Sequence, residues 1–214
     1  MDKAEIDEII EKIIDYSKNI EEDLAAPEVW EELKDPFKVL ISVIISIRTR
    51  EEVTIKAVRD FFKKFKDIED IKKASMGEIA NSLKMVGLNN QKARWIKEIA
   101  EKWDYKKICD EEFLQKLPGV GRKVRNVYLI IVCNRDYIAV DSNVHRIVNR
   151  IGIVNTKRFE ETERALYNII DKKYWRELNF NFVKFGRKIC KPINPRCDIC
   201  IIKNKCLYYK NKEK

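Results

Sequence analysis

The sequence predicts an all-α protein, and three observations support this fold class. Apolar residues recur at helical spacing along most of the chain, as in residues 6–14, where isoleucines fill one helix face. No alternating strand pattern of any length occurs. The 6 glycines and 5 prolines separate the apolar stretches as helix–helix turns do. With 214 residues, of which 45% are hydrophobic, the chain can form one large domain or two small ones.

The helical pattern can be followed in order along the chain. The first helix carries the isoleucine face, and Pro27 and the Asp-Pro pair at 35–36 then interrupt the pattern. Further helices are expected over residues 37–48, 51–65, 74–86, 89–103, 110–117 and 122–133. After a short extended piece, one helix over 141–152 and two or three more over 157–190 lead to a cysteine-rich segment.

Charge is unevenly distributed along the chain. The net charge is +9, yet residues 1–35 hold 4 basic and 13 acidic side chains, while residues 181–214 hold 10 basic and 2 acidic ones. A basic body with an acidic N-terminal helix indicates a polyanionic partner, with ordinary solvated surface as the alternative. Because the longest apolar run is too short to span a bilayer and the N-terminus has no signal-peptide core, we expect a cytoplasmic, intracellular protein without a membrane partner.

The stretch LQKLPGVGRKVRNVYL, residues 114–129, is the pattern of a helix-hairpin-helix. Pro118 ends one helix, and two glycines permit a tight turn before the next helix opens. Amides exposed at a helix N-terminus form a site suited to phosphate, so this hairpin is expected to grip the DNA backbone without reading sequence. A plain turn between core helices is the alternative. The hairpin residues expected to contact DNA are Gly119, Val120, Gly121, Arg122 and Arg125.

Lys123 lies in the first turn of the helix after this hairpin turn. The positive end of the helix dipole and two neighbouring arginines disfavour its ammonium form, and a neutral amine is what a nucleophilic lysine needs. A lysine that contacts phosphate is the alternative. Asp141, eighteen residues later, precedes a helix and fits either an N-cap or a carboxylate that works with Lys123. His145, the only histidine, is expected to be structural or phosphate-facing.

Four of the six cysteines lie in the stretch CKPINPRCDICIIKNKC. They are Cys190, Cys197, Cys200 and Cys206, at the spacing C-x6-C-x2-C-x5-C. Zinc ligands usually come as two close pairs separated by a longer span, whereas one compact loop suits a cubane iron–sulfur cluster with one thiolate per iron. Lys191 and Arg196 make the loop basic, as a second phosphate-contacting surface is. Cys109 and Cys133 are expected to be buried or free thiols.

The hairpin, the lysine, the aspartate and the cysteine spacing together resemble endonuclease III, a family of DNA base-excision repair enzymes. The resemblance covers almost the whole chain, and the combined order and spacing are much more specific than any single motif. It implies two helical domains with a DNA groove between them. One is a six-helix barrel of residues 25–135 bearing the helix-hairpin-helix at 110–129. The other is a helical iron–sulfur domain of residues 1–24 and 136–214, with the cluster loop at 190–206.

The resemblance also implies residue roles. The family's catalytic lysine and aspartate match Lys123 and Asp141. Its wedge leucine, which enters the base stack as a nucleotide flips out, matches Leu88, and the residue that fills the resulting gap matches Arg48. Its 4Fe–4S cluster, expected to be structural and DNA-positioning rather than a reagent, is bound by residues matching Cys190, Cys197, Cys200 and Cys206.

The implied reaction is base excision from damaged double-stranded DNA. The protein extrudes a damaged nucleotide, Lys123 attacks the sugar C1′ as a neutral amine, and the base departs. Asp141 accepts a proton or stabilises positive charge on the sugar. The resulting Schiff base permits β-elimination, which nicks the strand. The resemblance therefore predicts a DNA glycosylase with abasic-site lyase activity, acting as a monomer on the nucleoid.

Two positions depart from the family pattern, and a third distinguishes the chain from a related branch; all three bear on the substrate. Many endonuclease III sequences have Gln at Arg48 and often His at Asn143, and the stretch VDSNV looks more like adenine and mismatch-thymine glycosylases. Val43 stands where the adenine branch carries its catalytic Glu, and that branch's extra C-terminal domain is missing. Oxidised pyrimidines of the thymine glycol type are the first expectation, and uracil or thymine mismatched with guanine is the alternative.

Two other function classes remain open from the sequence. A non-catalytic DNA-binding module would use the hairpin and the cluster for positioning only, and it has no need of the lysine–aspartate pair. A zinc-stabilised interaction protein would lack the visible absorbance of an iron–sulfur cluster.

Overall fold

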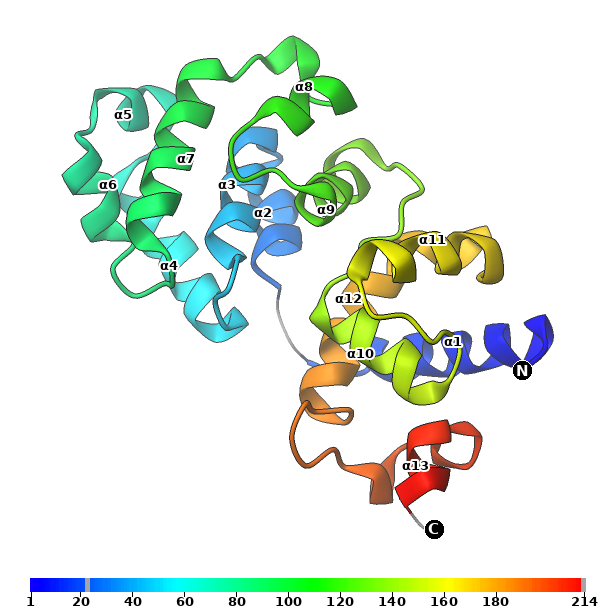
Figure 1. The fold of residues 1–214 in the computed structure, drawn as a ribbon. Coiled ribbons are helices and arrows are strands. Elements are labelled where there is room, and N and C mark those ends of the chain that lie inside the picture. Colours follow the sequence, from blue (N-terminus) through cyan, green and yellow to red (C-terminus); the bar gives the residue numbers. More distant parts are fainter. Residues whose placement is uncertain (22–23, 213–214) are drawn as a thin grey trace. The chain divides into compact units, whose positions relative to one another are not determined.

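The computed structural model describes residues 1–21 and 24–212, and every regular element within those ranges is a helix (Figure 1). This confirms the all-α fold class. The chain divides into two compact units, one of residues 1–22 and 136–214 and the other of residues 23–135. None of the helices in the described ranges combines the length and the apolar character that crossing a membrane requires.

The unit of residues 23–135 is built around one buried helix. Its elements are α2 (Ala25–Leu33), α3 (Pro36–Ser46), α4 (Glu51–Lys64), α5 (Ile68–Lys73), α6 (Met76–Ser82), α7 (Asn89–Lys102), η1 (Tyr105–Lys107), α8 (Glu111–Lys116) and α9 (Arg122–Cys133). The Asp35 carboxylate caps α3, and Pro36 occupies its first position, where a missing N–H costs nothing. Because α3 packs against α2, α4, α7 and α9, eight of its 11 residues are buried.

The sequence pattern does not predict three of the shorter helices, and α2 shows why. Pro27 is the third residue of α2, and the backbone N–H groups of the first turn have no partner within a helix. A proline there is therefore tolerated and does not interrupt the helix. The other two are α5, which begins after its N-cap Asp67, and α13 (Leu207–Lys212), which lies beyond the last expected helix.

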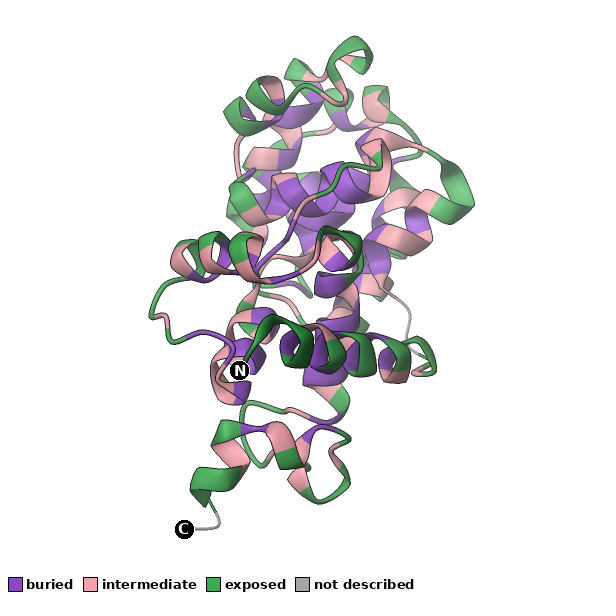
Figure 2. Cartoon of the chain, turned by 90° about the vertical axis from the view of Figure 1, so that its right-hand side faces the viewer, coloured by how far each residue is buried: buried purple, intermediate pink, exposed green. Residues whose placement is uncertain are grey.

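The unit that contains both chain ends has its own core. Its elements are α1 (Lys3–Lys18), α10 (Ser142–Ile151), α11 (Phe159–Ile169), η2 (Lys172–Tyr174), α12 (Trp175–Lys188), η3 (Cys197–Ile199), η4 (Lys203–Lys205) and α13. The predicted isoleucine face of α1 is buried, and Figure 2 shows α1, which starts at the N-terminus, with one buried side. Helix α1 packs against α12, which also packs against α10. Burying one such side chain contributes about 1.5–3 kcal/mol.

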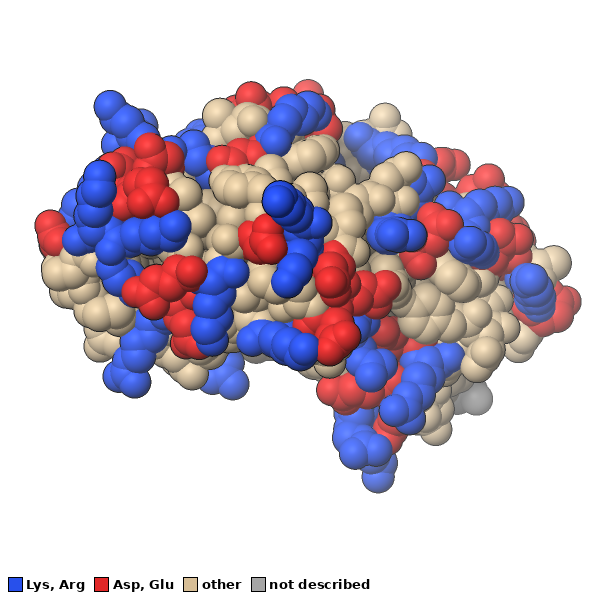
Figure 3. Space-filling model, turned by 90° about the horizontal axis from the view of Figure 1, so that it is seen from above, with Lys and Arg blue, Asp and Glu red and all other residues tan. Residues whose placement is uncertain are grey.

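Charged side chains of both signs are interspersed on the face shown in Figure 3. Some pair along a single helix, as Lys12 does with Glu8 and Lys102 with Glu98, at 2.7 and 2.6 Å. Exposed pairs of this kind contribute about 0.3–0.5 kcal/mol each. The net charge alone therefore does not identify a DNA-facing surface, and the local geometry of the motifs has to do so.

Candidate nucleic-acid interface and cysteine site

The helix-hairpin-helix pattern folds as α8, a tight turn and α9, and α9 spans the residues expected from the sequence. Gly119 in the turn has a φ of +76°, and a Cβ there would lie 2.7 Å from the Trp95 ring. Both the backbone and the packing therefore require glycine at this position. Gly121 is the N-cap of α9, and nothing lies within 4 Å of the place its Cβ would take.

The first turn of α9 has the features of a phosphate site. No side chain caps this helix start, so its amides and the positive end of the helix dipole are not neutralised by a capping oxygen. Arg122 is exposed and Lys123 is half-buried in this turn. Val120 is buried, at 5% exposure.

Arg125 is engaged within the hairpin. Its guanidinium donates to Gln115 Oε1 on α8 at 2.9 Å and to Asn126 Oδ1 at 3.0 and 3.2 Å. A carboxylate oxygen of Glu111 lies 3.9 Å away, and the Arg125 side chain is 15% exposed. These contacts connect α8 to α9, so the Arg125 side chain stabilises the hairpin.

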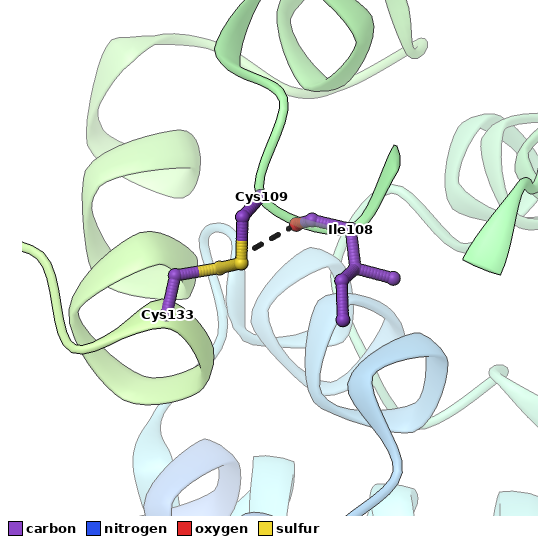
Figure 4. The surroundings of a disulfide bond; sticks show 3 residues. All are labelled: Ile108, Cys109 and Cys133. Atoms are coloured by element: carbon purple, nitrogen blue, oxygen red, sulfur yellow. Dashed lines mark hydrogen bonds between the residues drawn. A yellow bond between two sulfur atoms is a disulfide. The ribbon is translucent and has the colours of Figure 1, made fainter. Parts of the chain in front are cut away.

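Cys109 and Cys133 form a disulfide, which corrects the expectation that they are buried or free thiols (Figure 4). Cys109 lies just before α8, and Cys133 is the last residue of α9; their Cα atoms are 5.9 Å apart. The Ile108 carbonyl oxygen lies 3.6 Å from the Cys133 sulfur. The bond joins residues separated by 24 positions, so it closes a loop that contains the whole hairpin.

Asp141 is the N-cap of α10. One of its carboxylate oxygens accepts hydrogen bonds from the amides of Asn143 and Val144, both at 2.9 Å. The other oxygen accepts from the side-chain amide of Asn143 at 3.2 Å. The capping role is therefore present, and these three bonds fix the orientation of a half-buried carboxylate.

A chain of hydrogen bonds leads from Asp141 to the cysteine loop. The Arg146 guanidinium donates to Asn143 Oδ1 at 2.8 Å and to the Cys190 carbonyl oxygen at 3.0 and 3.1 Å. Burial lowers the pKa of Arg146 from its ordinary value. A Cβ on Gly186 would lie 2.7 Å from Asn143 Oδ1, so glycine on α12 permits the close approach of α10. The capping carboxylate and the start of the loop are thus joined through two side chains.

The four cysteines of the loop line one pocket. They are Cys190, Cys197, Cys200 and Cys206, of which Cys206 is buried and the others are half-buried. Arg150 contributes to the pocket wall, where its guanidinium donates to the Cys190 sulfur at 3.5 Å and to the Lys191 carbonyl oxygen at 2.6 Å. Lys191 and Arg196, the two basic residues expected to contact DNA, are both exposed on this loop.

The four thiols of this pocket are a donor set suited to a cubane cluster. In the described ranges, no three His, Cys, Asp or Glu side chains lie close enough together to hold a metal ion. A cubane cluster needs each thiolate on a different iron, so four cysteines around a shared pocket satisfy it. Burial raises the pKa of Cys200 to about 11 and also raises that of Cys206, so metal binding must displace protons from these thiols.

Arg48 and Leu88, the expected gap-filling and wedge residues, lie on two neighbouring loops of the unit of residues 23–135. Both are exposed, and both have left-handed backbones, with φ of +51° and +61°. Such angles are uncommon outside glycine and often mark functional sites. A Cβ on Gly87 would lie 3.0 Å from the Arg48 carbonyl oxygen, so the two loops are in close contact.

Three further residues at these sites were not identified from the sequence. Arg146 and Arg150 hold the cysteine loop, and Lys92, beneath the loops of Arg48 and Leu88, is completely buried. A signal for Lys92 was available, because it lies four residues before Ile96 on the apolar face of α7. The arginines have no comparable signal, since the loop carbonyls that they bond, those of Cys190 and Lys191, are distant in sequence.

Comparisons with known proteins agree with this geometry. Residues 41–172 match the model of the HhH-GPD superfamily base excision DNA repair proteins. The chain is 42% identical over 184 residues to endonuclease III of Thermotoga maritima, covering 84% of this chain and 86% of that protein. It is 27% identical over 197 residues to a thymine/uracil-DNA glycosylase of Pyrobaculum aerophilum, covering 86% of each.

Solved structures give the same result. A trapped endonuclease III–DNA covalent intermediate matches with a TM-score of 0.88 at 26% identity, covering 100% of both chains. A thermostable thymine-DNA glycosylase matches with a TM-score of 0.81 at 27% identity, covering 98% of this chain and 97% of that one. The family resemblance inferred from the motifs is confirmed.

Proposed function

Because the chain belongs to the HhH-GPD superfamily of base excision DNA repair proteins, we propose that it is a DNA glycosylase that also cleaves the strand at the abasic site. The observation that carries the lyase part is the amine of Lys123 in the uncapped first turn of α9. A phosphate bound at this turn would bring the sugar of a neighbouring nucleotide within reach of that amine. A glycosylase without a lyase step does not need a primary amine there.

The proposed reaction begins with an extruded nucleotide. The lone pair of the Lys123 amine forms a bond to C1′, the bond from C1′ to the base breaks, and the base leaves with the electron pair. Asp141 accepts a proton or stabilises the positive charge on the sugar. Ring opening gives a Schiff base, loss of a C2′ proton expels the 3′ phosphate, and hydrolysis then releases Lys123.

We assign a 4Fe–4S cluster to the four cysteines of the loop, in a structural role. When bound, the cluster holds the loop in a fixed shape, so that the exposed Lys191 and Arg196 can meet the DNA backbone. The colour and composition of the protein test this assignment. We expect a brown protein with about four irons per chain, and loss of the colour in Cys200→Ser. A colourless protein containing one zinc would contradict the assignment.

Oxidised pyrimidines in duplex DNA are the proposed substrates, and the protein is expected to act as a monomer on the nucleoid. The endonuclease III similarity at 42% identity supports this choice. Uracil or thymine opposite guanine is the second candidate. It is favoured by the similarity to a thymine/uracil-DNA glycosylase and by Asn143, which contacts Asp141 where endonuclease III sequences often have His.

Borohydride trapping tests the proposal and separates the two substrates. Duplexes would each carry thymine glycol, dihydrouracil, uracil opposite guanine, thymine opposite guanine or an abasic site. We expect a covalent adduct because borohydride reduces a Schiff base, and fastest trapping on thymine glycol. Fastest trapping on a guanine mismatch would select the second candidate.

Lys123→Gln is the control for this experiment. It should abolish the adduct and the nicking, because an amide is not a nucleophile, while binding of damaged DNA stays largely intact. A wild-type protein that forms no adduct, even on the abasic duplex, would rule out the lyase. Full nicking by Lys123→Gln would show that another group is the nucleophile.

A further inference from the structure

Lys92 is the one lysine among the fully buried large side chains of the described residues, with 0% exposure. Its ammonium donates to the Ile45 carbonyl oxygen at 2.7 Å and to the Thr49 hydroxyl oxygen at 2.9 Å. Burial lowers the pKa of Lys92 to about 8, because removing the charged ammonium from water costs free energy. Because lysine is rarely fully buried, the two hydrogen-bond partners of its ammonium indicate what it does in this fold.

The hydrogen bond from Lys92 to Ile45 satisfies a main-chain carbonyl at the C-terminal end of α3. The last carbonyls of a helix have no partner within it, and the amide of Thr49, which would continue the helix, donates to Ser46 instead, at 3.1 Å. The Lys92 ammonium takes the Ile45 carbonyl, and a cation at a helix C-terminus is favourable. The chain can therefore leave the helix immediately before Arg48.

The second contact lies on the other side of Arg48. The Thr49 hydroxyl accepts from Lys92 and donates to the Ile47 carbonyl oxygen at 3.2 Å. One ammonium group therefore bonds to residues that flank Arg48 on both sides. These bonds hold the left-handed backbone of Arg48, which an isolated loop would rarely adopt.

Residue 92 also meets the second loop, here through the main chain of α7 rather than through its side chain. The Lys92 amide donates to the Leu88 carbonyl oxygen at 2.9 Å in the first turn of α7, where Leu88 is the left-handed N-cap. Gly87 meets the Arg48 backbone closely enough that a Cβ would lie 3.0 Å from its carbonyl oxygen. The two loops thus touch at Gly87 and are tied together at Lys92.

We infer that Lys92 is a positioning residue for base extrusion, which holds Arg48 and Leu88 in a fixed relation so that they enter the base stack together. The inference rests on the proposed function, and on the gap-filling and wedge roles that the family resemblance implies for Arg48 and Leu88. In this role, Lys92 itself touches neither the DNA nor the reacting atoms. It acts by keeping two side chains from different loops preorganised, which spares the cost of ordering them on DNA.

The test uses Lys92→Met, which keeps an unbranched side chain one atom shorter and removes the ammonium donors. Lys97→Met is the matched control, because Lys97 is also on α7 and donates to main-chain carbonyls, those of Ile71, Lys72 and Ala74. A base analogue such as 2-aminopurine opposite the lesion reports extrusion by stopped-flow fluorescence. Trapping on a single-stranded abasic oligonucleotide reports the Lys123 chemistry without a base stack to open.

We expect Lys92→Met to slow extrusion and single-turnover excision on duplexes by about tenfold or more, since small misplacements have effects of this order. Trapping on the single strand should stay at the wild-type rate. Lys97→Met should lower the melting temperature but leave extrusion unchanged. Thr49→Val, which removes one acceptor of the Lys92 ammonium, should slow extrusion in the same direction and provides the test if Lys92→Met does not fold.

A double-mutant cycle distinguishes positioning from a general loss of stability. In a protein carrying Arg48→Ala and Leu88→Ala, Lys92→Met should have no further effect on extrusion. Wild-type extrusion by Lys92→Met, with a melting temperature lowered as in Lys97→Met, would overturn the inference. A wild-type protein that excises no lesion and forms no adduct would instead refute the proposed function, and the inference with it.

Discussion

Asp141 has an observed structural role and a proposed chemical role, and two substitutions separate them. Asparagine caps helices about as well as aspartate does, so Asp141→Asn should keep the stability of the protein within about 0.5 kcal/mol. The loss of the negative charge should reduce base excision by about 100-fold or more. Urea unfolding and single-turnover excision on the same preparations measure the two effects.

Asp141→Ala completes the comparison. It removes the two cap bonds to the amides of Asn143 and Val144, so it should cost about 1 kcal/mol in addition to the lost activity. Excision by Asp141→Asn at the wild-type rate would mean that the residue is a helix cap and nothing more. The bonds from Asn143 and Arg146 would then serve only to hold α10 against the cysteine loop.

At the scale of elements, the hairpin turn contains two glycines, and the fold requires glycine at Gly119 but not at Gly121. Gly119→Ala places a Cβ 2.7 Å from the Trp95 ring on a left-handed backbone, so it should destabilise the protein by more than about 2 kcal/mol. Gly121→Ala meets open space and should change stability by less than about 1 kcal/mol. Chemical denaturation of both variants checks this, and equal losses would show that the turn is not held by Trp95.

The disulfide around the hairpin should stabilise this element measurably. A loop of 24 residues corresponds to about 2–4 kcal/mol in the chain-entropy account. The double variant Cys109→Ser, Cys133→Ser should therefore melt at a lower temperature than the wild type under non-reducing conditions. Reductant should lower the wild-type melting temperature to that of the variant and leave the variant unchanged. Labelling of both thiols in the non-reduced protein would contradict the bond.

Elements with strong local signals were predicted closely, and those that depend on distant contacts were not. The bounds of α9 follow from Gly121 at its start and a long apolar run, and both are local in sequence. Pro27 was interpreted as a break because its effect depends on the position within the helix, which the sequence alone does not fix. The Cys109–Cys133 bond depends on the fold of the hairpin, since a spacing of 24 residues has no meaning on its own.

The predictions of candidate site residues also depend on whether the signal is local in the sequence. Lys123, Asp141 and the four cysteines belong to motifs with fixed spacing, so they could be selected from the sequence. Val120 and Arg125 were selected by proximity to the turn, yet one is buried and the other bonds to Gln115 across the hairpin. Which side chain of a motif faces outward is set by packing, and a list of residues does not contain that information.

At the scale of the whole molecule, the excess of positive charge predicts salt-dependent DNA binding. Log affinity should fall linearly with log salt concentration, and Lys191→Ala and Arg196→Ala should each reduce the slope by about 1, with no change in lesion preference. Lys12→Ala is the control, because Lys12 lies on the acidic helix α1 and pairs with Glu8. Fluorescence anisotropy with undamaged duplex measures the slopes, and unchanged slopes in both loop variants would place the phosphate contacts elsewhere.

The assembly of one unit from both chain ends has a consequence for biosynthesis. The isoleucine face of α1 leaves the ribosome well before its partner α12, which begins only at Trp175. At ordinary rates of translation that partner follows roughly 8–30 s later. Residues 23–135 can fold in the meantime as a unit, but the nascent α1 carries an uncovered apolar stripe until α12 has been synthesised. We expect the acidic side chains along α1 to oppose association of that stripe with other chains until its partner arrives, because like charges repel.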